Sequence, residues 1–370
     1  MDRRQFLRTS ALSAGVLLFA RSPLTWAVET PYGALLDPDV NGIRLPAGFR
    51  SRVVARSEQQ VPGTLHLWHR YPDGGAVFPS RGGGWIYVSN SEVPLVGGAG
   101  ALRFNRNGKV VDAYRVLTGT SVNCAGGPTP WGTWLSCEEH PAGLVWECDP
   151  TRPGQGIPRP ALGSFSHEAV AVDPVRRQLY LTEDDGTDGG DGFYRFTPDR
   201  YPDLSAGSLE AAVRADDGSV SWVEVDPLLP MRLQRPGAAT VFDGAEGVWY
   251  HAGHVFFSTK SDNRIWDLDV AADHIGIRYD AGQPLNGVDN IVGSAGGDLY
   301  VAEDGGDMQI CILTTDGQVA AVLQVTGHDG SEITGPAFDP SGTRLYFSSQ
   351  RGEGGAGAGI TYEVTGPFRP

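Results

Sequence analysis

The feature that most constrains this chain is a unit of two short apolar runs that recurs along the sequence. Each unit opens with a polar or small residue, passes through a turn that contains Gly or Pro, and closes in acids or amides 14 to 16 residues later. β-branched and aromatic residues dominate the runs, which predicts strands joined by tight turns. The units open near the following six residues: Ala76, Cys124, Glu168, Glu246, Asp289 and Glu332.

The spacing of these openings is 43 to 48 residues, except for one interval of 78. Periods of about 40 to 50 residues with several strands in each are typical of propeller blades. The sequence therefore predicts an all-β fold, a six-bladed β-propeller. The long interval predicts an insertion between the third and fourth units, from about Thr187 to Thr240.

Acidic residues occupy four of the six openings. The inner strands of a propeller line a central channel, so residues at equivalent positions of successive blades meet there. Carboxylates in a narrow channel repel one another and cannot all stay ionised without cations. Each acid could instead cap a turn or accept backbone hydrogen bonds, but four in one register favour a shared cation site. These four are Glu168, Glu246, Asp289 and Glu332.

The N-terminus indicates export. Arg3–Arg8 is a twin-arginine motif, a modest apolar stretch follows, and Thr25–Ala27 is a cleavage site. We expect residues 1–27 to be a twin-arginine signal peptide and residues 28–370 to form a single propeller domain. The protein is then periplasmic or secreted, with the twin-arginine export machinery as its partner. This route carries folded proteins, often already loaded with cofactor, and we expect a monomer.

The charge balance excludes one class of partner. The chain has 29 basic and 44 acidic residues and a net charge of −15, whereas a nucleic-acid-binding protein needs a basic face. Bound cations can compensate clustered carboxylates. Only four cysteines occur, too few for a disulfide framework, although Cys137 and Cys148 could pair across a hairpin.

The most distinctive segment is Asn123–Glu139, with the sequence NCAGGPTPWGTWLSCEE. Its glycines and prolines fix the backbone path, which would hold Cys124 at one end and Glu138 and Glu139 at the other. Cys124 stands at a channel-facing opening, so its thiolate is a candidate ligand for a transition metal. The alternative is a small core residue.

This segment resembles the signature of the PhoX family of alkaline phosphatases. Four shorter segments also resemble PhoX motifs, in the same order: Ser166–Ala169, Glu246–Trp249, Val288–Ile291 and Ala302–Gly305. The resemblance extends over most of the chain after the N-terminus. It implies calcium-dependent phosphatases on a six-bladed propeller, with iron and calcium ions around a bridging oxygen on the axis.

The resemblance also implies a ligand set. Cys124 would be the thiolate ligand of Fe³⁺, and Glu139, Glu168 and Glu246 match acids that the family uses as metal ligands. Oxygen ligands of this kind suit Ca²⁺, and carboxylates with a thiolate suit Fe³⁺. Five further residues fall in family motifs that face the same cluster: Glu138, Asp289, Asn290, Glu303 and Asp304.

One departure concerns phosphate binding. Many larger PhoX enzymes have a basic residue just before the acid equivalent to Glu246, and this chain has Ala245 there. Lys260 and Arg351, each just after a second strand, are the nearest substitutes as phosphate contacts. The alternative for either residue is an exposed cation at the rim of the propeller.

The sequence thus predicts a phosphomonoesterase that acts on a small phosphoester, with a metal-activated water or oxo group as nucleophile. A calcium-dependent lactonase of the gluconolactonase or paraoxonase kind is the second hypothesis. Such a lactonase needs one catalytic Ca²⁺ and no thiolate. The third hypothesis is a non-catalytic propeller that binds metal only for stability.

Overall fold

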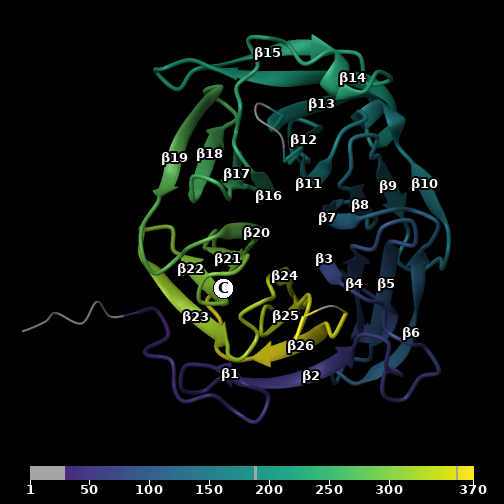
Figure 1. Ribbon diagram of the computed structural model, residues 1–370, viewed down its shortest axis with the longest axis vertical. Helices are drawn as coiled ribbons and strands as arrows, with labels where there is room; N and C mark the ends of the chain where they lie inside the picture. Colours follow the sequence, from purple (N-terminus) through teal and green to yellow (C-terminus); the bar gives the residue numbers. More distant parts are fainter. Residues whose placement is uncertain (1–29, 187–189, 356) are drawn as a thin grey trace, which may run out of the picture.

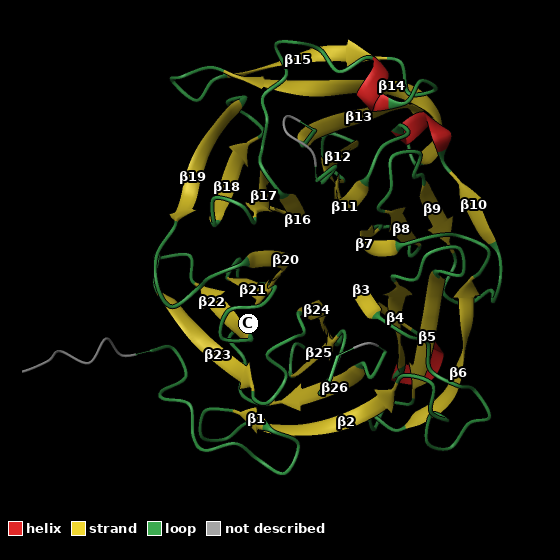
Figure 2. Ribbon diagram, viewed as in Figure 1, coloured by secondary structure: helices red, strands yellow, loops and turns green. Residues whose placement is uncertain are grey.

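The computed structural model describes residues 30–186, 190–355 and 357–370, and it confirms the six-bladed β-propeller. Six antiparallel sheets stand around a central axis (Figure 1). The described residues are almost entirely strands and loops (Figure 2), with three short 3-10 helices, η1 (Arg81–Gly83), η2 (Pro160–Leu162) and η3 (Met231–Leu233). None of the described helices has the length and apolar character needed to cross a membrane.

Each blade orders its strands from the axis outward. The innermost strands are β3 (Pro72–Pro79), β7 (Asn123–Pro128), β11 (His167–Asp173), β16 (Ala245–His251), β20 (Val288–Gly293) and β24 (Ile333–Phe338). The second strands are β4 (Trp85–Ser91), β8 (Trp134–Glu138), β12 (Gln178–Glu183), β17 (His254–Thr259), β21 (Leu299–Glu303) and β25 (Arg344–Ser349).

The outer strands complete the blades. The third strands are β5 (Gly98–Phe104), β9 (Val145–Cys148), β13 (Gly192–Arg200), β18 (Arg264–Asp269), β22 (Gln309–Leu313) and β26 (Ile360–Thr365). The fourth strands are β6 (Val110–Leu117), β10 (Gly156–Pro158), β14 (Asp203–Arg214), β19 (His274–Asp280), β23 (Val319–Val325) and β2 (Arg50–Arg56). Strands β15 (Val220–Val225) and β1 (Ile43–Arg44) extend two of the sheets.

Two features hold this ring of blades together. Strand β2, near the start of the chain, pairs with β26 near its end, so the last blade closes the circle with strands from both ends. Apolar and aromatic side chains fill the space between neighbouring blades, as where Phe193 stacks on Phe257 with ring centroids 4.2 Å apart. This burial supplies most of the favourable free energy of folding.

The segment expected as an insertion belongs mainly to one blade. It contains β13 and β14, the regular third and fourth strands, followed by the additional strand β15 and helix η3. Cys137 and Cys148, which the sequence left open as a pair across a hairpin, form no disulfide. In the β8–β9 hairpin Cys137 lies opposite Val145 and Cys148 lies opposite Trp134, so both thiols stay free and buried.

Candidate metal centre

Every innermost strand departs from regular pairing near the same point. The irregularities begin at Pro72, Asn123, His167, Ala245, Val288 and Thr334. A bulge of this kind bends the strand and turns a side chain out of the regular alternation. In five of the six strands the residue that follows is a candidate ligand, and these are Asp73, Cys124, Glu168, Glu246 and Asp289.

Small residues allow these strands to approach one another closely. Gly74 follows Asp73, and a Cβ atom there would lie 2.4 Å from Cα of Ala125 on the next blade. Gly247 follows Glu246, and its Cβ would lie 2.7 Å from the carbonyl oxygen of Asp289. Glycine is therefore required at both positions for the inner strands to converge.

A second set of side chains comes from the second strands. In each blade the first residue after that strand occupies an equivalent place, and these residues are Glu92, Glu139, Asp184, Lys260, Asp304 and Gln350. Successive residues of a strand point to opposite sides. The side chain of the last residue in a second strand therefore points to the opposite side from the side chain of the residue that follows it.

Members of the two sets, together with Glu332 just before β24, form four overlapping groups in which the candidate ligand atoms all lie within 4.8 Å of one another. The shared members Glu168, Asp289 and Glu332 join the groups into one cluster, which we call the axial cluster. The groups are Cys124 with Glu139 and Glu168, Glu168 with Glu246 and Asp289, Asp289 with Asp304 and Glu332, and Asp73 with Glu92 and Glu332.

Burial and mutual repulsion dominate the electrostatics of the axial cluster. Glu168 and Glu246 are only 1% and 3% exposed. Burial, followed by repulsion from neighbouring carboxylates, raises the pKa of both well above the usual range. The same two causes raise the pKa of Glu139 to about 8. Burial raises the pKa of Asp289 to about 7, against the attraction of Lys260.

Two cations lie beside the axial cluster. Lys260 forms an ion pair with Glu246, and its Nζ is 3.2 Å from Oδ2 of Asp304. Nη2 of Arg351 is 2.8 Å from Oε1 of Glu332. Burial alone would lower the pKa of Lys260, but attraction to the surrounding carboxylates outweighs burial and raises it. Eight carboxylates therefore face two cations, and this imbalance calls for further positive charge.

The donor atoms present fit metal ions. Nε2 of Gln350 donates to Asp73 Oδ2 at 2.5 Å and to Glu92 Oε2 at 2.6 Å. Its carbonyl oxygen is buried without a partner among the described residues, and an amide oxygen of this kind is a calcium ligand. Sγ of Cys124 is 3.1 Å from Oε1 of Glu168, so one group offers sulfur with oxygen, while the other groups offer oxygen alone.

Most of the ligands that the sequence predicts come together in the axial cluster. Six of the nine belong to the four groups: Cys124, Glu139, Glu168, Glu246, Asp289 and Asp304. Lys260 and Arg351, the predicted phosphate contacts, lie beside them.

Glu138, Glu303 and Asn290 lie outside the four groups and make local hydrogen bonds. Glu138 accepts from the backbone amides of Ser121 and Leu144 and from the indole of Trp146. The oxygens of Glu303 accept from two backbone amides. Glu138 and Glu303 end their strands, so their side chains point away from those of Glu139 and Asp304.

Asn290 is a neighbour of the cluster. Its Nδ2 donates to Asp289 Oδ1 at 2.8 Å, and its Oδ1 accepts from the amide of Gly335 at 2.8 Å. Both polar ends are therefore engaged, and the side chain holds the Asp289 carboxylate in place.

Sequence reasoning placed Glu332 in the ring but not among the ligands, and it missed Asp73 and Glu92. Asp73 could have been found from a pattern that it shares with Glu246, because each of these acids is followed directly by a glycine, Gly74 or Gly247. Glu92 follows the end of its second strand as Glu139 does, and that position was the signal for it.

Two solved structures share the fold of this chain. The structure is similar to that of Pseudomonas fluorescens PhoX in complex with vanadate, a transition state analogue, with a TM-score of 0.70, 16% identity and coverage of 90% of this chain and 97% of that chain. A gluconolactonase from Xanthomonas campestris has a TM-score of 0.55 and 14% identity, with coverage of 91% and 99%. At these identities the likeness shows the fold alone.

Sequence comparison gives the family. No curated protein sequence matches the chain. The sequence profile of alkaline phosphatase PhoX matches residues 86–143 and 139–276, which together are more than half of the chain. The chain therefore belongs to the PhoX family of alkaline phosphatases.

Proposed function

We propose that this chain is a phosphomonoesterase that depends on Fe³⁺ and Ca²⁺ bound at the axial cluster. The observation that carries the proposal is the convergence of eight carboxylates and one thiol, from all six blades, in a member of the PhoX family. The similarity to a propeller that binds vanadate, a transition state analogue, supports phosphoryl chemistry at this site.

The donor atoms divide the axial cluster between the two metals. Cys124, Glu139 and Glu168 combine sulfur with carboxylate oxygen, which suits Fe³⁺. The other three groups contain only oxygen, which suits Ca²⁺ with its 6–8 oxygen ligands. Bound metal ions would neutralise the phosphoryl oxygens and activate the attacking water.

Lys260 and Arg351 are the residues of this chain that can bind the phosphoryl group. Their side chains are 35% and 37% exposed, so each can contact a ligand that enters the site while keeping its acidic partner. Positive charge fixed beside the phosphorus stabilises charge that develops in the transition state. Lys260 forms an ion pair with Glu246 itself. It therefore places a cationic side chain beside Glu246, which Ala245 cannot do.

Hydrolysis of p-nitrophenyl phosphate, measured beside a panel of lactones with and without Ca²⁺, tests the proposal. We expect phosphatase activity that requires Ca²⁺, and we expect Glu246→Gln to abolish it with little loss of secondary structure. Glu138→Gln is the matched control, because Glu138 lies outside the axial cluster. Calcium-dependent lactone hydrolysis without phosphatase activity would refute the proposal in favour of a lactonase, and inactivity on both would favour a non-catalytic propeller.

Export is a further part of the proposal. The twin-arginine motif and the cleavage site fall within residues 1–29, outside the described residues. We propose a periplasmic or secreted monomer, exported with its metals bound. Cleavage after Ala27 can be measured by mass spectrometry of the mature protein.

A further inference from the structure

A basic groove lies at the end of the first blade that is distant from the axial cluster. Asp73 stands near one end of β3, and Ser80 follows the other end, which separates the two by about 20 Å at the rise of a strand. The groove has a volume of about 950 Å³, and two smaller cavities share lining residues with it. It is therefore distinct from the proposed metal site.

Positive charge gathers around this groove although the chain as a whole carries −15. Three acids line the three cavities, and each has a partner inside the protein. Asp112 pairs with Arg103, Asp339 accepts hydrogen bonds within its own turn, and the buried Glu363 binds two arginines. The cavities are lined by six arginines, which are Arg50, Arg52, Arg81, Arg103, Arg106 and Arg344.

Several of these cations are available to a ligand. Arg81 and Arg106 are exposed residues of the groove, and neither forms an ion pair with any of the described residues. Lys109, in the same turn as Arg106, is also exposed and unpaired within the described chain. Half-buried Tyr114 and exposed Val111 supply apolar lining between the charges.

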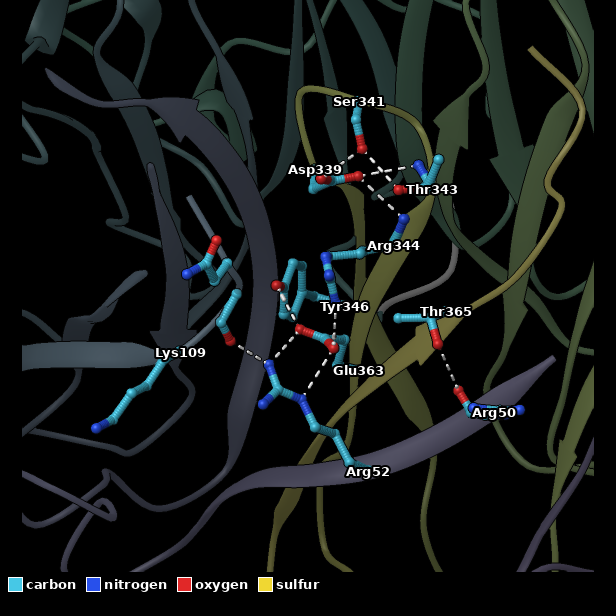
Figure 3. A network of polar contacts seen from close by, with 12 residues as sticks. Arg50, Arg52, Lys109, Asp339, Ser341, Thr343, Arg344, Tyr346, Glu363 and Thr365 are labelled. Carbon is cyan, nitrogen blue, oxygen red and sulfur yellow. Dashed lines mark hydrogen bonds and ion pairs between the residues drawn. The ribbon is translucent and has the colours of Figure 1, made fainter. Parts of the chain in front are cut away.

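A rigid network holds the turn that carries these cations. Arg52 donates to Glu363 at 2.6 Å and to the carbonyl oxygen of Gly108 at 2.5 Å, and Arg344 reaches the same carboxylate at 2.8 Å. Figure 3 shows both arginines converging on Glu363, while Lys109 extends away from the network. Since the carbonyl group of Gly108 is held between Arg106 and Lys109, the backbone that carries these two cations is ordered before any ligand binds, which lowers the entropic cost of binding.

We propose that this groove binds a soluble polyanion that carries several phosphate or sulfate groups. Arginine binds such groups with paired, charge-assisted hydrogen bonds. A groove of this size has room for a small molecule. Because salt screens distant charges, a small ligand in the groove interacts mainly with the nearby arginines, whereas an extended anionic membrane surface would also face the acidic remainder of a chain with a net charge of −15. The site does not depend on the proposed phosphatase activity.

Calorimetric titration with sucrose octasulfate tests the site, because this probe contains no phosphoester that the enzyme could hydrolyse. We expect binding that weakens at high salt and that is at least about tenfold weaker in Arg81→Ala/Arg106→Ala. Arg176→Ala/Arg177→Ala is the matched control, since these exposed arginines lie in another blade outside the groove. Its affinity should equal that of the wild type.

Two further arms distinguish this groove from the axial cluster and from a membrane-binding surface. Glu246→Gln should bind the probe normally, and the Arg81/Arg106 variant should keep its phosphatase activity and its melting temperature. Vesicles rich in phosphatidylglycerol should not sediment the protein. The inference is overturned if the wild type does not bind the probe at millimolar concentration, if both arginine pairs behave alike, if binding is lost in Glu246→Gln, or if vesicles bind and the soluble probe does not.

Discussion

Removal of bound metal should make the stability of this protein fall as the pH rises. Asp289 has a pKa near 7 in the folded chain, against 3.8 for an unperturbed aspartate. Between these values the folded state holds a proton that the unfolded state has released, so the free energy of unfolding decreases with pH. The stabilisation from this proton is fully present below pH 3.8, the pKa of the unfolded state, and is lost as the pH rises through about 7, the pKa of the folded state.

The size of the effect follows from the same pKa values. Between pH 5 and pH 7 each pH unit lowers the free energy of unfolding by about 1.4 kcal/mol, and the loss levels off above pH 7, so Asp289 alone accounts for about 3 kcal/mol. Glu139, whose pKa is about 8, acts in the same direction. A chain of this length has an unfolding entropy of roughly 0.7 kcal/mol per kelvin at its melting point, which converts 3 kcal/mol into a shift of about 4 °C.

The assay is thermal unfolding followed by circular dichroism at pH 5 and pH 8.5, in chelator and in excess Ca²⁺. We expect a melting temperature that falls by about 4 °C or more in chelator and changes much less with Ca²⁺, since cations keep the carboxylates ionised without repulsion. Asp289→Asn should be more stable than the wild type in chelator at pH 8.5. Equal pH dependence with and without metal would refute the reasoning.

Five further variants separate the parts of the site. Cys124→Ser should remove iron and the associated colour while calcium stays bound, as measured by elemental analysis and absorption spectra; retained iron would reject the thiolate ligand. Glu139→Gln should lower the metal content, whereas Glu138→Gln should keep it and reduce stability by about 1–3 kcal/mol through lost buried hydrogen bonds; equal metal loss in both would contradict the assignment. Lys260→Ala and Arg351→Ala should each reduce kcat/KM for p-nitrophenyl phosphate by about 100-fold with metal retained, and unchanged kinetics would remove these residues from phosphate binding.

The architecture could be predicted from the sequence because a blade is a local unit. Each inner and second strand forms one hairpin within a short stretch, so apolar runs and turn residues mark both. Equivalent positions then predict convergence on the axis without any knowledge of the long-range packing. Glu168, Glu246 and Asp289 were found in this way.

The candidate ligands that were missed or wrongly assigned depend on single-residue details within a blade, which the spacing of the repeat does not show. In the first blade the predicted opening at Ala76 lies three residues beyond Asp73, which stands within the bulge, so this acid was overlooked. For pairs such as Glu303 and Asp304, composition cannot tell which acid faces the axis. Which of the two acids faces the axis depends on the residue at which the strand ends, which is Glu303. Because side chains alternate along a strand, Asp304 then points inward and Glu303 points away.

The central claim is that cations hold the carboxylates of the axial cluster together. Elemental analysis of the folded protein, purified without chelator, tests it most directly. The account predicts iron and more than one calcium ion per chain, both of which fall in Glu168→Gln. A protein that contains less than one metal ion per chain, yet is folded and stable at pH 8.5, would contradict it.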